Sequence, residues 1–303
     1  MILPFANTAE GGTEQMRVEP LSEDCGAIIR PEFEREILSL NTYDLIELFK
    51  SVGVILFRFP CNHEEFELFT KQFGQTFIPH TNTLRKIISG DGSTMTVTPG
   101  GQEIYVHSEM SYSPFRPDLV WFRCAMPAPV GGETLLCDGV RVLQRMHRMD
   151  MELFRAKRIK YMYRDISKWG SFLGMNQSVA SRSVPLAAGF PGAKCRFDED
   201  GTLNYFEYSV SAISSTKFTN EDAFSCSLLD WGYSFEDASF EDDTPITLKL
   251  LEDLRELTDQ STFQLKLESN DILMIDNTRI MHGRLGYDDS SRCVHVRMCN
   301  VNF

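Results

Sequence analysis

The sequence predicts a mainly β protein, a sandwich or barrel that carries a few helices on its outside. From about residue 94, short runs rich in β-branched and aromatic residues follow one another, separated by clusters of Gly, Pro, Asn and Asp. The C-terminal part returns to the same texture after one helical stretch. Helical spacing of apolar residues is confined to a few short segments, so the strands are expected to form the core and the helices to cover it.

The N-terminal quarter is expected to fold as helix, strand and helix. Residues 41–52 place Leu45, Leu48 and Phe49 on one helical face, and Gly53 is placed to end that helix. Residues 54–59 read as a buried strand, and residues 63–73 repeat the helical pattern up to Gly74. The first part of the chain, about 30 residues, is polar and is expected to wrap loosely or to end in a short strand.

The rest of the chain supplies most of the strands. We expect strands within residues 94–98, 104–112, 119–126, 133–138, 263–267, 272–275 and 293–299. Helices are expected at residues 140–151 and 244–258, the second with Thr244 as its N-cap and Pro245 at its first position. Residues 165–243 show no clear period and are expected to form a lid or substrate insert within a single domain of residues 1–303.

Composition excludes several classes of protein. A formal net charge of −13 leaves no basic surplus for binding a nucleic-acid backbone. No apolar run approaches the roughly 20 residues of a membrane span, and no signal peptide pattern opens the sequence. The eight cysteines form no CxxC pair, which argues against a zinc ribbon and for reduced, mostly buried thiols. We therefore expect a cytoplasmic protein that binds neither membranes nor nucleic acid.

One histidine has a carboxylate two positions further on, inside a β-like run. His107 and Glu109 would point to the same face of a strand and could hold one metal ion with a nitrogen and an oxygen. A third ligand from a distant strand would complete a facial triad and leave three coordination positions open, as an oxygenase requires. An isolated H-x-E sequence is weak evidence, because such pairs are common on protein surfaces.

A second block supplies a candidate third ligand. Residues 271–284 (DILMIDNTRIMHGR) place His282 after an apolar strand and a polar turn. A lone histidine there is more often a structural hydrogen-bonding residue, but Gly283 beside it permits close approach of another backbone. Ten residues after His282 comes Arg292, whose guanidinium could bind a dicarboxylic acid through two hydrogen bonds.

These two blocks resemble the taurine dioxygenase (TauD/TfdA) superfamily. The resemblance spans roughly residues 50–300 and is dense in residues 107–139 and in MIDNTRIMHGR. Glu109 indicates the branch with Glu in place of Asp, which includes clavaminate synthase, amino-acid β-hydroxylases and syringomycin-type hydroxylases. The resemblance implies a double-stranded β-helix core, of the jelly-roll or cupin-like kind, with helical decoration.

The resemblance also assigns roles residue by residue. His107, Glu109 and His282 match the family's iron ligands, and Thr134, 27 residues after His107, matches a threonine that helps to bind 2-oxoglutarate. The arginine that pairs with the far carboxylate is Arg292 or Arg297, which lie five apart and would face opposite sides of a strand. We favour Arg292; a register shifted by one residue would favour Arg297.

Members of this family use Fe(II), 2-oxoglutarate and O₂ to oxidise an unactivated C–H bond, releasing succinate and CO₂. Hydroxylation is the expected outcome, with desaturation or cyclisation open, and Glu109 disfavours halogenation because halogenases lack this carboxylate. The substrate is expected to be an amino acid or an amino-acid-derived intermediate of natural product biosynthesis, either free or presented by a carrier protein. A carrier would need a basic docking patch, for which the candidates are Lys157, Arg158, Arg145 and Arg148. The oligomeric state, homo-oligomer included, stays open.

Two alternatives keep the scaffold and change the activity. The same ligands suit zinc or manganese in a hydrolase or isomerase, and a non-catalytic binding protein could use the same fold. Other polar residues have competing interpretations as well. Asp276 and Asn277 either orient His282 or build a turn, and Gln102 and Glu103 either contact substrate or lie in a surface loop. His147 and His295 are expected to be structural. His63 and His80 carry no spacing signal, although family members use a residue in the region of 80 near the substrate.

Overall fold

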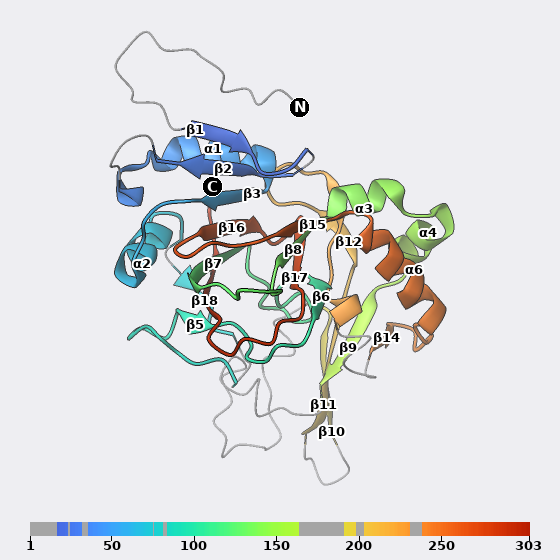
Figure 1. The fold of residues 1–303 in the computed structure, drawn as a ribbon. Helices are drawn as coiled ribbons and strands as arrows, with labels where there is room; N and C mark the ends of the chain where they lie inside the picture. The colour runs from blue at the N-terminus through green and yellow to red at the C-terminus, as the bar shows by residue number, and fades with distance from the viewer. Residues whose placement is uncertain are drawn as a thin grey trace.

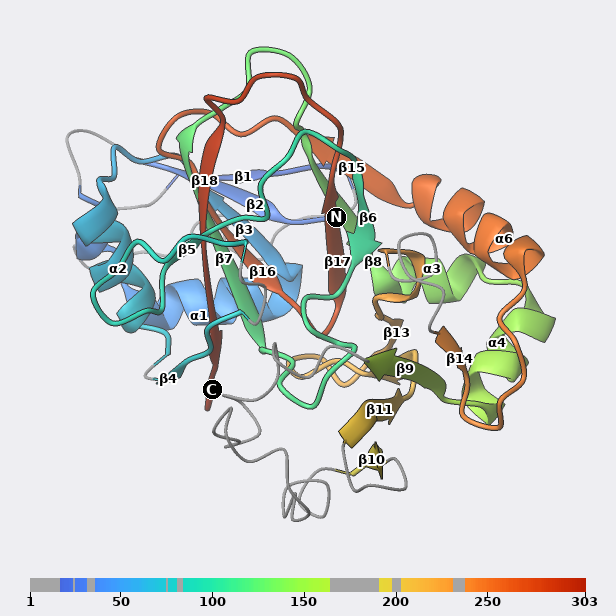
Figure 2. The ribbon, with the colours of Figure 1, turned by 90° about the horizontal axis from the view of Figure 1, so that it is seen from below.

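The computed structural model describes residues 17–23, 25–31, 36–74, 76–80, 84–163, 191–197, 203–230 and 238–303. Its core consists of a large and a small β-sheet, with helices on the outer side of each, as Figures 1 and 2 show. The helices α1 (Thr42–Val52) and α2 (His63–Lys71) flank the large sheet. The helices α3 (Gly139–Arg145), α4 (Arg148–Ala156) and α6 (Leu248–Asp259) lie on the side of the small sheet.

The large sheet has the order β1-β2-β3-β16-β7-β18-β4, with β5 beside β18. Only β2 and β3 pair in parallel among its described strands. In this order the strands are β1 (Arg17–Pro20), β2 (Ala27–Arg30), β3 (Val54–Phe57), β16 (Ile272–Asp276), β7 (Leu119–Met126), β18 (Cys293–Asn300), β4 (Thr76–Phe77) and β5 (Met95–Thr96).

The small sheet is antiparallel and has the order β15-β8-β17-β6. Its strands are β15 (Thr262–Leu265), β8 (Thr134–Asp138), β17 (Ile280–Arg284) and β6 (Ile104–His107). A turn at residues 277–279 carries the chain from β16 of the large sheet directly to β17 of the small one. Because the chain crosses between sheets in this way, strands distant in sequence become neighbours in each sheet.

Successive side chains along each strand of the large sheet point to opposite faces, and this alternation divides the core into layers. On β16, Ile272 and Met274 face α1 and α2, whereas Leu273 and Ile275 face the small sheet. β3 and β7 alternate in the same register, which sends every second side chain to each face as a pleated strand requires. Continuous apolar runs such as ILMI are therefore explained by burial on both faces of the large sheet.

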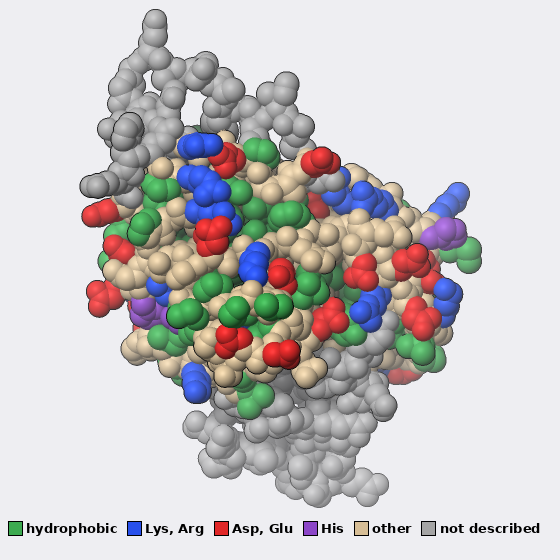
Figure 3. All heavy atoms as spheres, in the orientation of Figure 1, with side chains coloured by type: hydrophobic (Ala, Val, Ile, Leu, Met, Phe, Trp, Pro, Cys, Tyr) green, Lys and Arg blue, Asp and Glu red, His purple; other side chains and the backbone are tan. Residues whose placement is uncertain are grey.

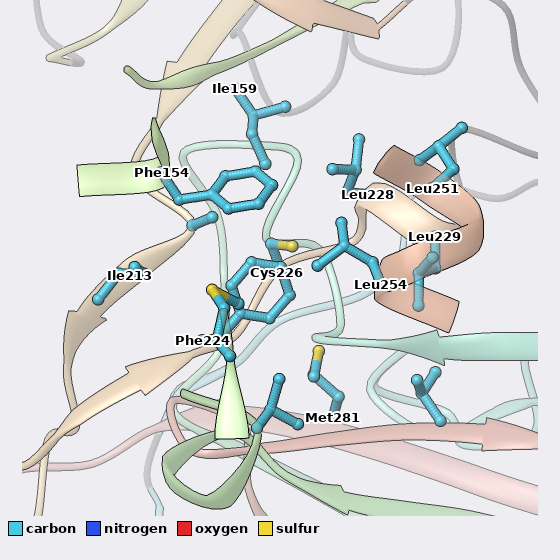
Figure 4. Close-up of a cluster of buried hydrophobic side chains, with 14 of the residues drawn as sticks. Phe154, Ile159, Ile213, Phe224, Cys226, Leu228, Leu229, Leu251, Leu254 and Met281 are labelled. Atoms are coloured by element: carbon cyan, nitrogen blue, oxygen red, sulfur yellow. The ribbon is translucent and has the colours of Figure 1, made fainter. Parts of the chain in front are cut away.

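The outer face of the small sheet packs against the second group of helices. Figure 4 shows Met281 of β17 pointing into a cluster with Phe224, Cys226 and Leu254. Because Met281 faces these helices, its neighbour His282 faces the opposite way, toward the large sheet, where its ring meets Phe122 at 5.1 Å. The packing of a methionine thus fixes the direction of a candidate ligand.

Residues 165–243 were expected to be an insert without clear periodicity. Residues 164–190, 198–202 and 231–237 lie outside the described part of the chain, so the lid stays a prediction. The described remainder contributes a hairpin of β12 and β13 and three strands that join β9, which precedes it, in a four-stranded sheet with the order β10-β11-β9-β14. These strands are β9 (Ile159–Tyr163), β10 (Ala193–Phe197), β11 (Leu203–Val210), β12 (Ile213–Ser215), β13 (Asp222–Phe224) and β14 (Ala238–Phe240).

The predicted helix–strand–helix at the N-terminus is confirmed, but two other helices differ from expectation. Residues 140–151 do not form one helix: α3 ends at Arg145, and His147 caps α4 by accepting a hydrogen bond from the Met149 amide. The helix expected from Thr244 begins at Leu248, because Thr247 is the residue that caps it. A 3₁₀ turn, η1 (Ile37–Ser39), precedes α1.

Within the described residues, no helix combines the length and apolar character needed to cross a membrane.

Candidate active site

Two histidines from neighbouring strands of the small sheet lie side by side. His282 of β17 is the direct partner of His107 at the end of β6, and their ring centroids are 4.7 Å apart. Gly283 makes this approach possible, because a Cβ at that position would lie 2.5 Å from the carbonyl oxygen of Ile104 on β6. The role suggested for Gly283 by the sequence, close backbone approach, is confirmed.

Glu109 reaches the two histidines from a turn rather than from a strand. β6 ends at His107, and Met110 has a left-handed backbone with φ of 54°. The expectation that His107 and Glu109 share one face of a strand is therefore wrong, although the side chains still converge. One ligand atom from each of His107, Glu109 and His282 lies within 4.8 Å of the others, and all three side chains are largely shielded from solvent.

The side chain of Asn277 holds the turn that carries Glu109. Its Oδ1 accepts a hydrogen bond of 2.7 Å from the Glu109 amide, and its Nδ2 donates to the carbonyl oxygens of Glu109 and Pro117. Asn277 is fully buried, and Arg116 donates to its carbonyl oxygen. Asn277 begins the turn of residues 277–279, which was one of its two expected roles, and its side chain orients Glu109 rather than His282.

The electrostatics of the cluster favour the protonation states that bind a metal. Burial raises the pKa of Glu109, but Arg85 and His80 outweigh it, and a hydrogen bond from His282 adds to their effect, so that this pKa lies well below its usual range. Burial lowers the pKa of His282 to about 4. An ionised carboxylate beside a neutral imidazole is the state required of metal ligands, because protonated ligands cannot coordinate.

The hydrogen bond of His107 also fits a metal. Nδ1 of His107 lies 2.8 Å from the Tyr105 carbonyl oxygen, which leaves Nε2 available, as is usual for a metal-bound histidine. Nδ1 of His282 is buried without a partner among the described residues. Two imidazoles and one carboxylate meeting at one point match the facial triad of non-haem iron oxygenases.

These three residues open onto a pocket between the two sheets. Its empty volume, with the open mouth included, is about 470 Å³. Thr134, at the start of β8, and Arg292, just before β18, line the same pocket, together with Arg85, Val97, Thr98, Ile104, Phe122, Gly283, Arg284 and Val294. The structure therefore brings together the three predicted ligands, Thr134 and Arg292.

The structure separates the two candidate arginines. Arg292 donates to the Gly132 carbonyl oxygen at 3.2 Å, and its buried Nη1 has no partner in the described part of the chain. Arg297 does not line the pocket: it is fully buried, donates to the Glu67 carbonyl oxygen and to Ser93, and lies over the ring of Phe77. Its cofactor-binding role, the weaker of the two alternatives, has no support in this geometry.

Three charged or polar residues at the pocket, His80, Arg85 and Arg284, were not predicted from the sequence with a defined role. His80 lies 3.1 Å from Glu109, and Arg85 lies 3.4 Å from it. Arg284 donates to the carbonyl oxygens of residues 98, 100 and 102 and so holds the rim of the pocket. His80 and Arg85 come from a segment without periodicity, so only their residue types signalled function, whereas Arg284 stands two positions after His282 and could have been found from that spacing.

The other polar candidates lie outside the pocket lining. Glu103 pairs loosely with Arg255 at 3.7 Å, and Gln102 contributes its carbonyl oxygen to Arg284. Asp276 accepts hydrogen bonds from the amide and hydroxyl of Thr278, the turn role that was one alternative. The remaining histidines are structural: His63 packs against His295, and His147 caps α4.

Comparison with known proteins gives consistent results. The model of the family described as "Taurine catabolism dioxygenase TauD, TfdA family" matches residues 17–299. A clavaminate synthase-like protein of Arabidopsis thaliana is 25% identical over 88% of this chain and 87% of its own length. The 3-((Z)-2-isocyanoethenyl)-1H-indole synthase of Fischerella ambigua is 20% identical over 93% of this chain and 88% of its own.

The fold is shared with solved structures. PvcB of Pseudomonas aeruginosa superposes with a TM-score of 0.63 at 14% identity, covering 97% of this chain and 95% of PvcB. A second PvcB structure, described as an Fe, alpha-ketoglutarate dependent oxygenase from an isonitrile synthetic pathway, gives 0.61 at 15% identity, with the same coverage. At these identities the likeness concerns the fold alone, and it confirms the predicted jelly roll. Because the family model spans nearly the whole sequence, the chain belongs to the TauD/TfdA family of dioxygenases.

Proposed function

We propose that this dioxygenase hydroxylates an unactivated C–H bond of an amino acid or an amino-acid-derived natural-product intermediate. Iron and 2-oxoglutarate dependence is the chemistry of its family, and the buried cluster of His107, Glu109 and His282 fits Fe(II). The observation that carries the proposal is the convergence of these residues in the pocket that Thr134 and Arg292 also line. A hydrolase would not call for a site suited to a dicarboxylate co-substrate.

Each residue then has a physical task. His107, Glu109 and His282 would hold the iron on one side, so that co-substrate and O₂ reach the other side. Thr134 and Arg292 would orient 2-oxoglutarate, the arginine by two parallel hydrogen bonds to the distal carboxylate. The iron supplies O₂ activation coupled to decarboxylation of 2-oxoglutarate. Burial between the two sheets excludes water from the reacting atoms.

A small-molecule substrate is supported by two relatives. One is named for its likeness to clavaminate synthase, and another is named as an isocyanoethenyl-indole synthase, so that its product is a small indole. The amino-acid class itself rests on the resemblance of residues 107–139 and of MIDNTRIMHGR to amino-acid β-hydroxylases.

A spectroscopic titration tests the proposal. Anaerobic Fe(II) and 2-oxoglutarate should produce a weak visible charge-transfer band with the wild-type protein. His107→Ala or Glu109→Ala should abolish the band, whereas His147→Ala, which changes an exposed histidine, should retain it. Tight zinc binding without the band would instead support a hydrolase.

The same titration separates the two arginines. Arg292→Gln should weaken 2-oxoglutarate binding by about 10- to 100-fold, because it removes a charge-assisted pair of hydrogen bonds. Arg297→Gln should lower the midpoint of unfolding and leave the affinity for 2-oxoglutarate within about threefold of wild type. The reverse pattern would assign the co-substrate to Arg297. Succinate formation from a panel of amino acids and carrier-bound aminoacyl groups then identifies the substrate.

A further inference from the structure

Arg85 is a buried cation in the pocket that the proposed chemistry leaves without a task. It lies between β4 and β5 and lines the pocket, and its side chain is 8% exposed. Its Nη2 lies 3.4 and 3.5 Å from the two carboxylate oxygens of Glu109. Strong guanidinium–carboxylate hydrogen bonds are shorter, about 2.7–2.9 Å, so this contact is loose.

Most of the hydrogen-bonding capacity of Arg85 is unused. Nε and Nη1 are buried and have no partner among the residues that the structure describes. Arg284, by contrast, is committed to three backbone carbonyl oxygens of the rim, and Arg292 belongs with Thr134 at the proposed co-substrate site. Burying a guanidinium with unsatisfied N–H groups is costly unless a ligand completes it.

The charges lining the pocket call for an additional anion. Three guanidinium groups, those of Arg85, Arg284 and Arg292, face one carboxylate, that of Glu109. Fe(II) and the dianion of 2-oxoglutarate cancel each other and leave this surplus unchanged. Asp230 interacts electrostatically with Arg85 without lining the pocket, and counting its carboxylate as well still leaves a surplus of one positive charge.

We infer that Arg85 binds the carboxylate of the primary substrate, and that the substrate is therefore a free acid rather than a carrier-bound thioester. The inference rests on the proposed function, because a Glu109 carboxylate that binds the metal through one oxygen keeps at most one oxygen for Arg85. The guanidinium is then held beside the metal with its donors available. An amino acid tethered through its carboxyl group as a thioester has lost its α-carboxylate, and only an acidic side chain would leave a carboxylate for Arg85.

The surface gives no support for the carrier alternative. Lys157 pairs with Asp242 at 2.7 Å, and Arg148 pairs with Glu152 at 2.7 Å. Arg145 donates to the carbonyl oxygen of Gln260. On the face shown in Figure 3, Lys and Arg side chains are interspersed with Asp and Glu side chains and form no single basic patch. Two of the four basic residues considered for carrier docking, Lys157 and Arg148, are thus paired with carboxylates of their own neighbours.

Paramagnetic relaxation tests the inference without knowledge of the natural substrate. The protein is loaded with Mn(II) and saturating 2-oxoglutarate, and proton relaxation of two probes is compared: 3-phenylpropionate and its primary amide. Bound probe protons near Mn(II) relax rapidly, so binding in the millimolar range is detected. The variants are Arg85→Gln, Arg85→Lys and Lys86→Gln; the last removes the same charge from the adjacent, exposed residue.

With wild type and Lys86→Gln, the carboxylate should relax strongly and the amide weakly. Arg85→Gln should weaken carboxylate binding by about tenfold or more and abolish the preference over the amide. Arg85→Lys should retain part of the preference for the carboxylate, because the positive charge remains although the planar guanidinium group is lost. If Arg85→Gln does not fold, Arg85→Lys is the variant that tests whether residue 85 binds the carboxylate.

Three results would overturn the inference. The first is that the amide binds as well as the carboxylate, and the second is that neither probe binds to the wild type. The third is that carboxylate relaxation persists in Arg85→Gln, which would indicate direct ligation of Mn(II). The proposed function is judged separately, by binding of 2-oxoglutarate to the metal-loaded wild type. If that binding occurs in wild type and is lost in Arg85→Gln, Arg85 serves the co-substrate instead.

Discussion

Asn277 connects two parts of the active site that lie 168 residues apart in the sequence. Its amide group satisfies both the N–H and the C=O of Glu109, and the next strand along the chain from Asn277 carries His282. One side chain therefore sets the distance between the carboxylate and the second histidine. Such outer residues orient metal ligands without touching the metal.

Replacing Asn277 by Ala should weaken metal binding by about 10- to 100-fold, because the Glu109 turn loses its fixed position. Competition titration with a fluorescent chelator would measure the affinities for Fe(II) and Mn(II). Asn300→Ala is the matched control, since Asn300 is an exposed asparagine at the end of β18 that bonds only the Asp118 amide among the contacts described. Unchanged metal affinity in Asn277→Ala would show that the turn keeps its shape without the amide.

At the level of secondary structure, the pairing of β6 with β17 places both histidines. The two strands pair at His107 and His282 and again at Ile104 and Arg284, with an irregularity between these pairs. Gly283 lies at that irregularity, where the backbone of β6 leaves no room for a side chain. The spacing of the two imidazoles therefore depends on a glycine that contributes no ligand atom.

Gly283→Ala should displace β6, lower metal affinity by about tenfold or more, and destabilise the fold by about 1–3 kcal/mol through overpacking. Thermal unfolding with and without Mn(II) measures both effects. Gly90→Ala provides the comparison, because a Cβ at Gly90 would meet nothing within 4 Å. If both variants retain wild-type metal affinity, close approach of the strands is not what holds the histidines in place.

The sequence was informative where local patterns determine structure. The N-terminal helices follow from apolar spacing and capping residues, and the strand at Leu119–Met126 was predicted with its bounds. The prediction of secondary structure failed where a single residue interrupted the expected helix or strand. His147 interrupts a helix by capping the next one, and Met110 bends the backbone after β6, so that Glu109 lies in a turn.

Some residues of the candidate site could likewise be predicted from the sequence, and others could not. The three ligands, Thr134 and Arg292 carry a recognisable spacing, and the structure places them around one pocket. Arg85 could not be found from spacing, because it lies in an irregular stretch between β4 and β5, two short strands at the edge of the large sheet. The choice between Arg292 and Arg297 depended on strand register, which only packing determines: the ring of Phe77 and the residues around Ser93 enclose Arg297.

At the level of the whole molecule, a net charge of −13 combines with two buried carboxyl groups at the ends of the central strand β16. Burial raises the pKa of Asp271 and of Asp276 to about 6, despite hydrogen bonds from the Glu268 amide and from Thr278 that act in the opposite direction. Both groups therefore hold protons in the folded state at a pH where the unfolded chain has released them. Self-repulsion among the excess acidic groups adds to the same tendency.

The pH dependence of stability should show opposing contributions from these carboxyl groups and from the buried histidines. A carboxyl group whose folded-state pKa is raised binds more protons when folded, so lowering the pH from 7.5 to 5.5 through about 6 favours the folded state, by about 1–2 kcal/mol for Asp271 and Asp276 together. His282 and His295 act in the opposite direction, because burial lowers the pKa of each to about 4 and the unfolded chain binds protons that the folded imidazoles do not. The histidine contribution is the larger, so the free energy of unfolding of the metal-free protein should fall over this range, and urea unfolding at a series of pH values measures it. Asp276→Asn should steepen the fall by about 1 kcal/mol, since asparagine can still accept the Thr278 hydrogen bonds without an ionisable group. A variant profile parallel to that of wild type would show that Asp276 takes up no proton on folding in this range.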